Sequence, residues 1–163
     1  MIEPTVVVAD ERGADGSLDV VVDIDRWRRL ALDVLVDSEV VGELTLTFVD
    51  REEIAELNLE HMGKAGPTDV LSFPMDDELV AGVPTLLGDV VISPAVAAEQ
   101  FADHAGTFDD ELALLVVHGI LHVLGHDHAE PEETARMRAS ERDLLQRFHW
   151  FGAAPAGFRQ SHD

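Results

Sequence analysis

The chain has no cysteine, which excludes both a disulfide framework and a metal centre built on thiolates. It also has no apolar run near the ~20 residues that a membrane-spanning helix needs. The N-terminal segment MIEPTVVVADERG lacks the basic start of a secretory signal peptide. From these absences we expect a cytoplasmic protein. The length fits one domain, which we place at 1–151, with a flexible C-terminal tail at 152–163.

Basic residues are scarce as well. The sequence has 11 Lys and Arg against 33 Asp and Glu, a formal net charge of −22, and Lys64 is its one lysine. This charge repels polyanions at long range and so argues against sequence-independent binding of nucleic acid. Salt screens exposed charges beyond ~8 Å, so RNA binding at one local site is still compatible with it. The acidity reflects either a compositional bias of the whole proteome or a surface that docks a basic partner protein.

Hydropathy patterns predict an α+β fold in a single domain. Alternating or β-branched runs indicate four strands, at 5–9, 42–50, 68–74 and 86–93. Apolar stripes at helical spacing indicate about five helices, at 23–37, 50–62, 94–104, 107–125 and 131–148. The expected order is β-α-β-α-β-β-α-α-α, which gives a mixed four-stranded sheet packed with helices.

Capping residues set the expected helix ends. Asp25 and Asp50 are the expected N-caps of the first two helices, and Thr107 forms a capping box with Asp110. Gly125 is the expected C-terminal stop of the fourth helix, which is apolar almost all round and therefore buried. The side chains expected to face inward from the first two helices are Trp27, Leu30, Ala31, Val34, Leu35, Ile54, Leu57 and Met62.

The segment HGILHVLGHDH at 118–128 holds four of the eight histidines. His118 and His122 are four residues apart and share a helix face, where both imidazoles can reach one ion at ~2.0–2.1 Å. Gly125 lets the chain leave the helix and return His128 as a third ligand. Three neutral nitrogens and one open position are typical of a catalytic zinc site. A three-histidine site also accepts nickel or cobalt.

Gly119 decides between two chemistries. The histidine spacing is that of the zinc-protease signature H-E-x-x-H-x-x-G-x-x-H, and Gly119 stands where the glutamate would be. In proteases this glutamate takes a proton from zinc-bound water and hands it to the leaving amine, which glycine does not do. Phosphodiester cleavage depends more on charge neutralisation and positioning. The sequence therefore weakens the protease interpretation and leaves phosphoryl chemistry open.

For the polar residues near the histidines, the sequence allows more than one role. His126 alternates with the third expected ligand, so we expect it to face solvent or to support a ligand from outside the coordination shell. Asp127 either orients a ligand imidazole, carries a proton in catalysis, or is a turn carboxylate without a role. Thr68 and Ser72 share a face of their strand, opposite Asp69, and either line a cleft beside the metal or belong to a plain core strand.

Several segments resemble one family. HGILHVLGHDH closely resembles the H-G-x-L-H-L-x-G-Y-D-H signature of the YbeY-type bacterial endoribonucleases, the ribosomal RNA maturation factors. GPTDVLSFPMD at 66–76 resembles the family's P-T-[DN]-V-L-S-F-P segment, and LLGDVVIS resembles its L-G-D-[IL]-x-I strand. FVDREEIAELN resembles the helix that leads into them. These matches cover most of residues 42–128 in the family's order.

The resemblance implies a zincin-like α+β fold and one zinc ion held by His118, His122 and His128. It implies hydrolytic cleavage of single-stranded RNA in 3′-end processing of small-subunit ribosomal RNA and in ribosome quality control. The implied partners are ribosomal RNA, the small ribosomal subunit with a basic ribosomal protein, and an assembly GTPase, without a membrane. We take His118, Asp127 and Lys64 as candidate catalytic residues.

One departure from the family bears on RNA binding. Many members carry Y-R-G-K before the P-T-D-V segment, and this chain has HMGK, with Met62 in place of the arginine. Methionine does not bind phosphate, so either another cation substitutes or this branch works without one. The candidate substitutes are Lys64, Arg136, Arg138 and Arg142.

The sequence is also compatible with two other functions. The acidic composition and the missing arginine also fit a ribosome-assembly binding factor whose zinc is mainly structural. A zinc metalloprotease is the third alternative, and Gly119 disfavours it.

Overall fold

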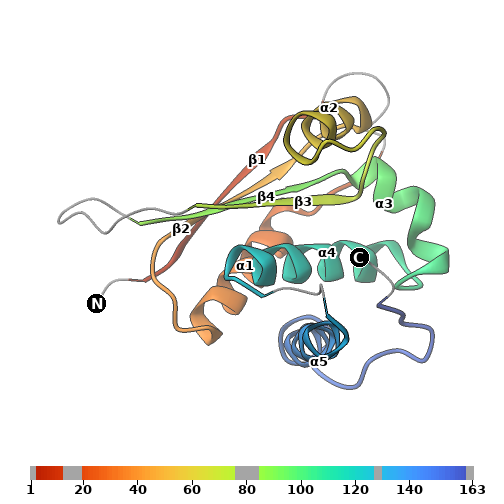
Figure 1. Ribbon diagram of the computed structural model, residues 1–163. Helices are drawn as coiled ribbons and strands as arrows, with labels where there is room; N and C mark the ends of the chain where they lie inside the picture. The colour runs from red at the N-terminus through yellow and green to blue at the C-terminus, as the bar shows by residue number, and fades with distance from the viewer. Residues whose placement is uncertain (1–2, 13–19, 76–84, 127–129, 161–163) are drawn as a thin grey trace.

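The computed structural model describes residues 3–12, 20–75, 85–126 and 130–160, and these form an α+β fold with a mixed sheet (Figure 1). The strands are β1 (Thr5–Asp10), β2 (Glu43–Phe48), β3 (Val70–Pro74) and β4 (Leu86–Ile92). The helices are α1 (Ile24–Asp37), α2 (Arg51–Met62), α3 (Pro94–Gln100), α4 (Phe108–Val123) and α5 (Pro131–Phe148). A short 3₁₀ helix, η2 (Phe101–Asp103), follows α3. The predicted fold class and element order are confirmed.

The sheet has the order β1-β2-β4-β3. β1 pairs with β2 and β2 with β4 in parallel, while β3 pairs with β4 in antiparallel fashion, with Val70 opposite Ile92. β3 is therefore an edge strand, and Pro74 at its end fits an edge because proline has no N–H to donate to a neighbouring strand. β3 packs against α4 and helps to form the site described below.

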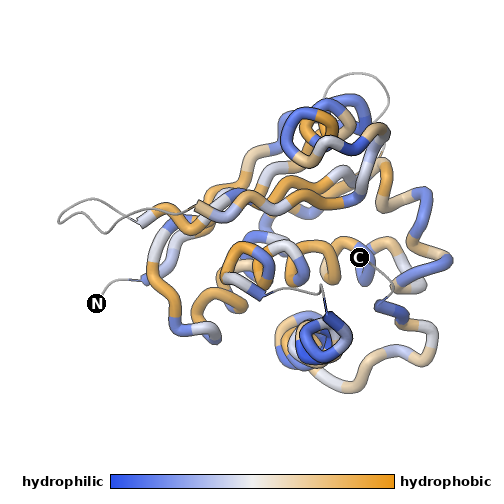
Figure 2. The backbone as a smooth tube through the Cα atoms, in the orientation of Figure 1, coloured by the Kyte–Doolittle hydropathy of each residue, from blue (hydrophilic) through white to orange (hydrophobic). Residues whose placement is uncertain are grey.

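The helices cover the two faces of the sheet unequally. Figure 1 shows α2 on one face, α1 and α4 on the other, and α5 beyond α4. α4 packs against β3, β4, α1 and α5, and nearly all of its side chains are buried. Figure 2 shows the corresponding hydropathy, with α4 mostly apolar and α5 polar on its outer side. No helix among the described residues has the length and apolarity needed to cross a membrane.

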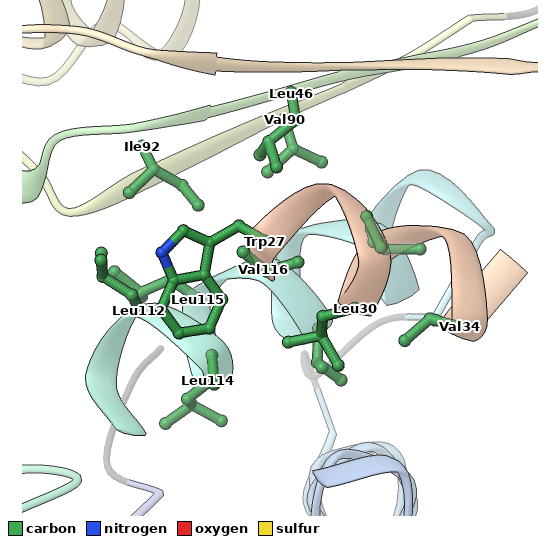
Figure 3. Packing of buried hydrophobic residues seen from close by; sticks show 14 of the residues in the cluster. Trp27, Leu30, Val34, Leu46, Val90, Ile92, Leu112, Leu114, Leu115 and Val116 are labelled. Atoms are coloured by element: carbon green, nitrogen blue, oxygen red, sulfur yellow. The ribbon is translucent and has the colours of Figure 1, made fainter. Parts of the chain in front are cut away.

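The main core lies between the sheet and the α1–α4 layer (Figure 3). Trp27 of α1, with 1% of its surface exposed, packs there among aliphatic side chains of the sheet and α4. The stripe predicted for α1 is buried as expected. In α2, Ile54 is fully buried and Leu57 partly buried, but Met62 is 43% exposed, because it ends the helix beside an open cleft.

Two of the three predicted N-caps are confirmed. The side chain of Asp50 accepts a hydrogen bond from Glu53 N, at 2.9 Å, and Thr107 Oγ1 accepts one from Asp110 N, at 3.1 Å. The third prediction, Asp25, is wrong. Asp23 caps α1 by accepting from Arg26 N at 3.2 Å, because the helix begins at Ile24 and Asp25 already lies in its first turn.

The chain after α5 folds back onto the core. Phe158 is only 6% exposed and meets the ring of Trp150 edge to face, with centroids 4.7 Å apart. Arg159 N donates to the carbonyl oxygen of His104, at 3.1 Å. Residues 152–160, which the sequence predicts to belong to a flexible tail, are thus fastened by one buried aromatic ring and backbone contacts. The rest of that segment, 161–163, lies outside the described residues.

Candidate metal centre

The two histidines of α4 lie together at one side of a cleft. Their ring centroids are 4.6 Å apart with an interplanar angle of 74°, as the four-residue spacing predicts. His118 is 5% exposed, and His122 is partly exposed. The cleft has a volume of about 350 Å³ and is lined by Asn58, Met62, Lys64, Thr68, Val70, Leu71, Ser72, Pro74, His118 and His122.

A Schellman turn ends α4 immediately after the pair. Gly125 has φ of +99°, its N–H donates to the carbonyl of His122 at 3.0 Å, and His126 N donates to the carbonyl of Leu121 at 2.9 Å. This is the left-handed helix stop that the sequence predicts at Gly125. It turns the chain away from the helix axis directly below the two imidazoles.

The remaining expected site residues of this loop, Asp127 and His128, lie outside the described residues. Within the described ranges, no group of three His, Cys, Asp or Glu side chains is placed to hold a metal ion. Imidazole pairs at this spacing suit a divalent cation such as zinc, but two ligands are fewer than a catalytic site needs. The three-histidine centre therefore stays a prediction, with two of its members placed side by side.

Glu141 of α5 makes a short polar contact with His118. Its Oε2 lies 2.5 Å from Nδ1 of His118, and Glu141 is only 3% exposed. Its Oε1 accepts a hydrogen bond from Gln160 Nε2, at 3.1 Å. Glu141 is not among the site residues predicted from the sequence. A signal was present, because Glu141 occupies the buried stripe of an otherwise charged helix, together with Met137, Leu144 and Leu145.

Gly119 of α4 packs directly against the sheet. A Cβ atom added there would stand 2.5 Å from Cγ1 of Val90, closer than real Cβ atoms come. The hydroxyl of Ser72 on β3 donates to the carbonyl oxygen of Gly119, at 3.1 Å. A side chain at this position would point into the sheet, so the glutamate of the protease signature has no room here. Glycine is required by packing.

The polar residues before and within β3 divide between two sides. Thr68 and Ser72 line the cleft with the two histidines of α4, as one of the two interpretations of this strand predicts. Asp69 does not line the cleft. Its Oδ2 accepts from Gln100 Nε2 at 2.6 Å, and its Oδ1 accepts from the hydroxyl of Thr68 at 3.4 Å.

Lys64 reaches the cleft because α2 ends in a left-handed turn. Gly63 has φ of +68°, and Lys64 N donates to the carbonyl of Asn58 at 3.3 Å. The buried side chain of Asn58 in turn donates to the carbonyl of Gly66, at 3.0 Å, and so holds the loop that carries Lys64. The one lysine of the chain is thereby brought to the same cleft as the two histidines.

The three arginines considered as alternatives lie elsewhere. Arg136 lines a separate groove of about 590 Å³, together with His126. Arg142 lies over the ring of Phe158, with its Cζ 5.7 Å from the centroid. Arg138 is exposed, and its carbonyl accepts from Gln160 at 2.7 Å. Of the four candidate cations, Lys64 alone lines the described cleft that contains both histidines.

Comparison with known proteins decides the family. The sequence model of the family described as Endoribonuclease YbeY matches residues 17–149. This chain belongs to the endoribonuclease YbeY family. The endoribonuclease YbeY of Thermobifida fusca is 46% identical over 150 residues, which cover 86% of this chain and 92% of that protein. The one of Salinispora tropica is 45% identical over 151 residues, covering 86% and 94%.

A solved structure agrees with the fold. The solution structure of TM1509 from Thermotoga maritima superposes with a TM-score of 0.56 at 24% identity, over 90% of this chain and 93% of that one. At this identity the likeness supports the fold alone. The family assignment confirms the resemblance found in the sequence motifs. It also confirms the expected enzyme class, a hydrolase that cleaves phosphodiester bonds, which is what the names of the relatives denote.

Proposed function

We propose that this chain is a zinc-dependent endoribonuclease that cleaves single-stranded RNA in 3′-end maturation of small-subunit ribosomal RNA and in ribosome quality control. The observation that carries the proposal is the His118–His122 pair, which shares a cleft with Lys64. The family assignment supports the reaction class. The packing of Gly119 leaves no room for the base that a protease of this signature needs.

One zinc ion per chain would be held by His118, His122 and His128. The neutral imidazoles of α4 suit zinc, and the turn at Gly125 redirects the chain so that a third ligand can follow. When bound, zinc supplies Lewis acidity that neutralises phosphate charge and lowers the pKa of water. Asp127 is the candidate proton carrier beside it.

The cleft residues would hold the RNA strand. Lys64 would pair with a phosphate, replacing the arginine that many family members carry two positions earlier. Thr68 and the apolar side chains of Val70 and Leu71, which also line the cleft, would lie beside the same backbone. One local cation suffices in a chain of net charge −22, because it acts at contact distance where screening is weakest.

The acidic surface would serve the protein partners. On the α2 side of the sheet, Glu11, Glu53 and Asp89 line a hollow of about 430 Å³ that also has apolar walls. Burial, and then the neighbouring charges of Glu11, Asp50 and Glu56, raise the pKa of the Glu53 carboxyl. Such a surface suits a basic ribosomal protein of the small subunit. An assembly GTPase is the other proposed partner, and the protein would act with both in the cytoplasm.

Cleavage of a labelled single-stranded RNA by purified protein tests this function. We expect cleavage by the wild type with zinc, and loss of it in His122→Ala or after chelation. Asp143→Asn, an exposed change on α5, serves as the control purified in the same way and should retain full activity. Equal cleavage by His122→Ala would show that a contaminating nuclease is responsible.

The alternative is a binding factor with a structural zinc, and the acidic hollow is the observation in its favour. It predicts that a folded His118→Ala variant rescues a strain with a ribosome-maturation defect. Failure of rescue by a folded variant would count against it.

The protease interpretation has its own test. Peptide cleavage that a zinc-directed hydroxamate inhibits would support it.

A further inference from the structure

The contact between α5 and the histidine pair has a role that the family assignment does not specify. We propose that Glu141 is a positioning residue that fixes the tautomer and ring orientation of His118 for metal binding. The proposal rests on the metal centre proposed above. It follows from three observations, namely the short contact with Nδ1, the second hydrogen bond of the carboxylate, and the burial of a carboxylate in an apolar stripe.

The contact fixes which nitrogen of His118 carries the proton. A carboxylate accepts hydrogen bonds and donates none, so the 2.5 Å contact requires Nδ1 to be the donor. In the neutral imidazole the lone pair then resides on Nε2, which is the atom left to bind a cation. A carboxylate behind a metal-binding histidine also raises the basicity of the ring and holds its orientation.

The second carboxylate oxygen of Glu141 explains why this residue is a glutamate and not a glutamine. Oε1 of Glu141 accepts from Gln160 Nε2, while the same Nε2 also donates to the carbonyl of Arg138 at 2.7 Å. That second bond fixes the orientation of the Gln160 amide. Glu141 therefore faces two donors, one on each oxygen. Glutamine at this position would have one acceptor for two donors and would lose one of the two bonds.

Burial shows that stability alone does not account for Glu141. It shares the buried stripe of α5 with Met137, Leu144 and Leu145, where leucine would pack without desolvating a charge. Its one salt-bridge partner among the described residues is His118. Buried charges are costly unless they are paired or serve a metal ion. A divalent cation on the far nitrogen of His118 would compensate the buried carboxylate through the ring.

Zinc affinity of the metal-stripped protein is the first test. Zinc is titrated in competition with a chromogenic chelator into the wild type, Glu141→Gln and the control Asp143→Asn, which removes one exposed charge from the same helix. We expect Glu141→Gln to bind zinc ~10–100-fold more weakly and Asp143→Asn to match the wild type. Unchanged affinity in a folded Glu141→Gln variant overturns the proposal.

The tautomer in the wild type is the second test, and it needs no variant. Long-range ¹H–¹⁵N correlation spectra of the metal-free protein at pH 8 report which nitrogen of each neutral imidazole is protonated. We expect His118 to be the Nδ1–H tautomer, and an Nε2–H tautomer overturns the proposal even where Glu141→Gln fails to fold.

The outcomes separate this inference from the metal centre on which it rests. A wild type that binds no zinc refutes both. Zinc binding that disappears in His122→Ala but is unchanged in Glu141→Gln refutes the role of Glu141 alone.

Discussion

The hydroxyl of Ser72 on β3 donates to the carbonyl oxygen of Gly119 on α4, at 3.1 Å, between the two histidines of the same helix. This bond ties the edge strand to the helix where a Cβ atom would already collide with Val90. The helix and the sheet therefore pack tightly beside the candidate metal centre.

Gly119→Ala should therefore destabilise the protein. The added methyl group overpacks the interface, which costs ~1–3 kcal/mol, and the higher helix propensity of alanine returns only up to ~1 kcal/mol. Urea unfolding followed by circular dichroism measures the difference. A second change, Val90→Ala, removes the colliding methyl groups, and a double-mutant cycle should show a favourable coupling of ~1 kcal/mol. Additive effects of the two changes would contradict the packing argument.

Lys64→Ala should weaken RNA binding and reduce its dependence on salt. Loss of one phosphate contact lowers the slope of log K against log salt by ~0.7 for a single strand. Fluorescence anisotropy in the His122→Ala background measures binding without cleavage. Arg29→Ala, an exposed change on α1 that lines none of the three hollows described above, should leave the slope unchanged. Identical slopes for wild type and Lys64→Ala would remove Lys64 from the RNA site.

Zinc should raise the thermal stability of the wild type. A ligand that binds only the folded state stabilises it by ~2.7 kcal/mol at a hundred times its dissociation constant. Differential scanning fluorimetry with zinc and then with a chelator should show an upward shift that reverses. His122→Ala should show no shift, because one of the two ligands on α4 is gone. A shift of equal size in His122→Ala would place the stabilising zinc elsewhere.

Acidification should destabilise the protein through His149. Burial lowers the pKa of His149, against an opposite pull from Asp110, whose Oδ1 lies 2.7 Å from Nε2. The unfolded chain therefore binds a proton at a higher pH than the folded one, and stability rises with pH through this window. The loss begins as pH falls through ~6.5, the ordinary histidine value.

His149→Gln tests this sign, since its amide donates from a similar position and does not titrate. Urea unfolding of metal-free protein between pH 5 and pH 8 should give a flatter profile for the variant than for the wild type. A steeper profile, or no difference, would contradict the assignment to His149.

The sequence predicted the features that depend on local spacing. The histidine pair follows from four-residue helix periodicity, the stop at Gly125 from its left-handed turn, and the α1 stripe from apolar residues at helical spacing. The N-cap at Asp23 was missed by two residues, because two aspartates flank the start of α1 and either can cap a helix. The role of Phe158 was missed because a single aromatic residue beyond the last helix carries no periodic signal.

Glu141 shows what local patterns leave out. Its contact with His118 joins residues 23 positions apart, and it exists only because α5 packs against α4. A carboxylate in an apolar stripe signals an unusual position, but only the packing of the two helices identifies its partner. The steric role of Gly119 could likewise not be predicted from the sequence. The sequence suggested only a chemical reason for this glycine, the absence of the protease glutamate, whereas the structure shows that it packs against Val90.

α4 has both a structural and a functional role in this fold. Its 16 residues contribute to the core and include His118 and His122. Its position is determined by the sheet on one side and by α5 on the other. The packing of the core and the position of the two histidines therefore cannot change independently, because a core substitution that shifts α4 also shifts both imidazoles. Substitutions at core positions of α4 that do not line the cleft, such as Leu115 or Ile120, should therefore be constrained by selection on activity as strictly as by selection on folding.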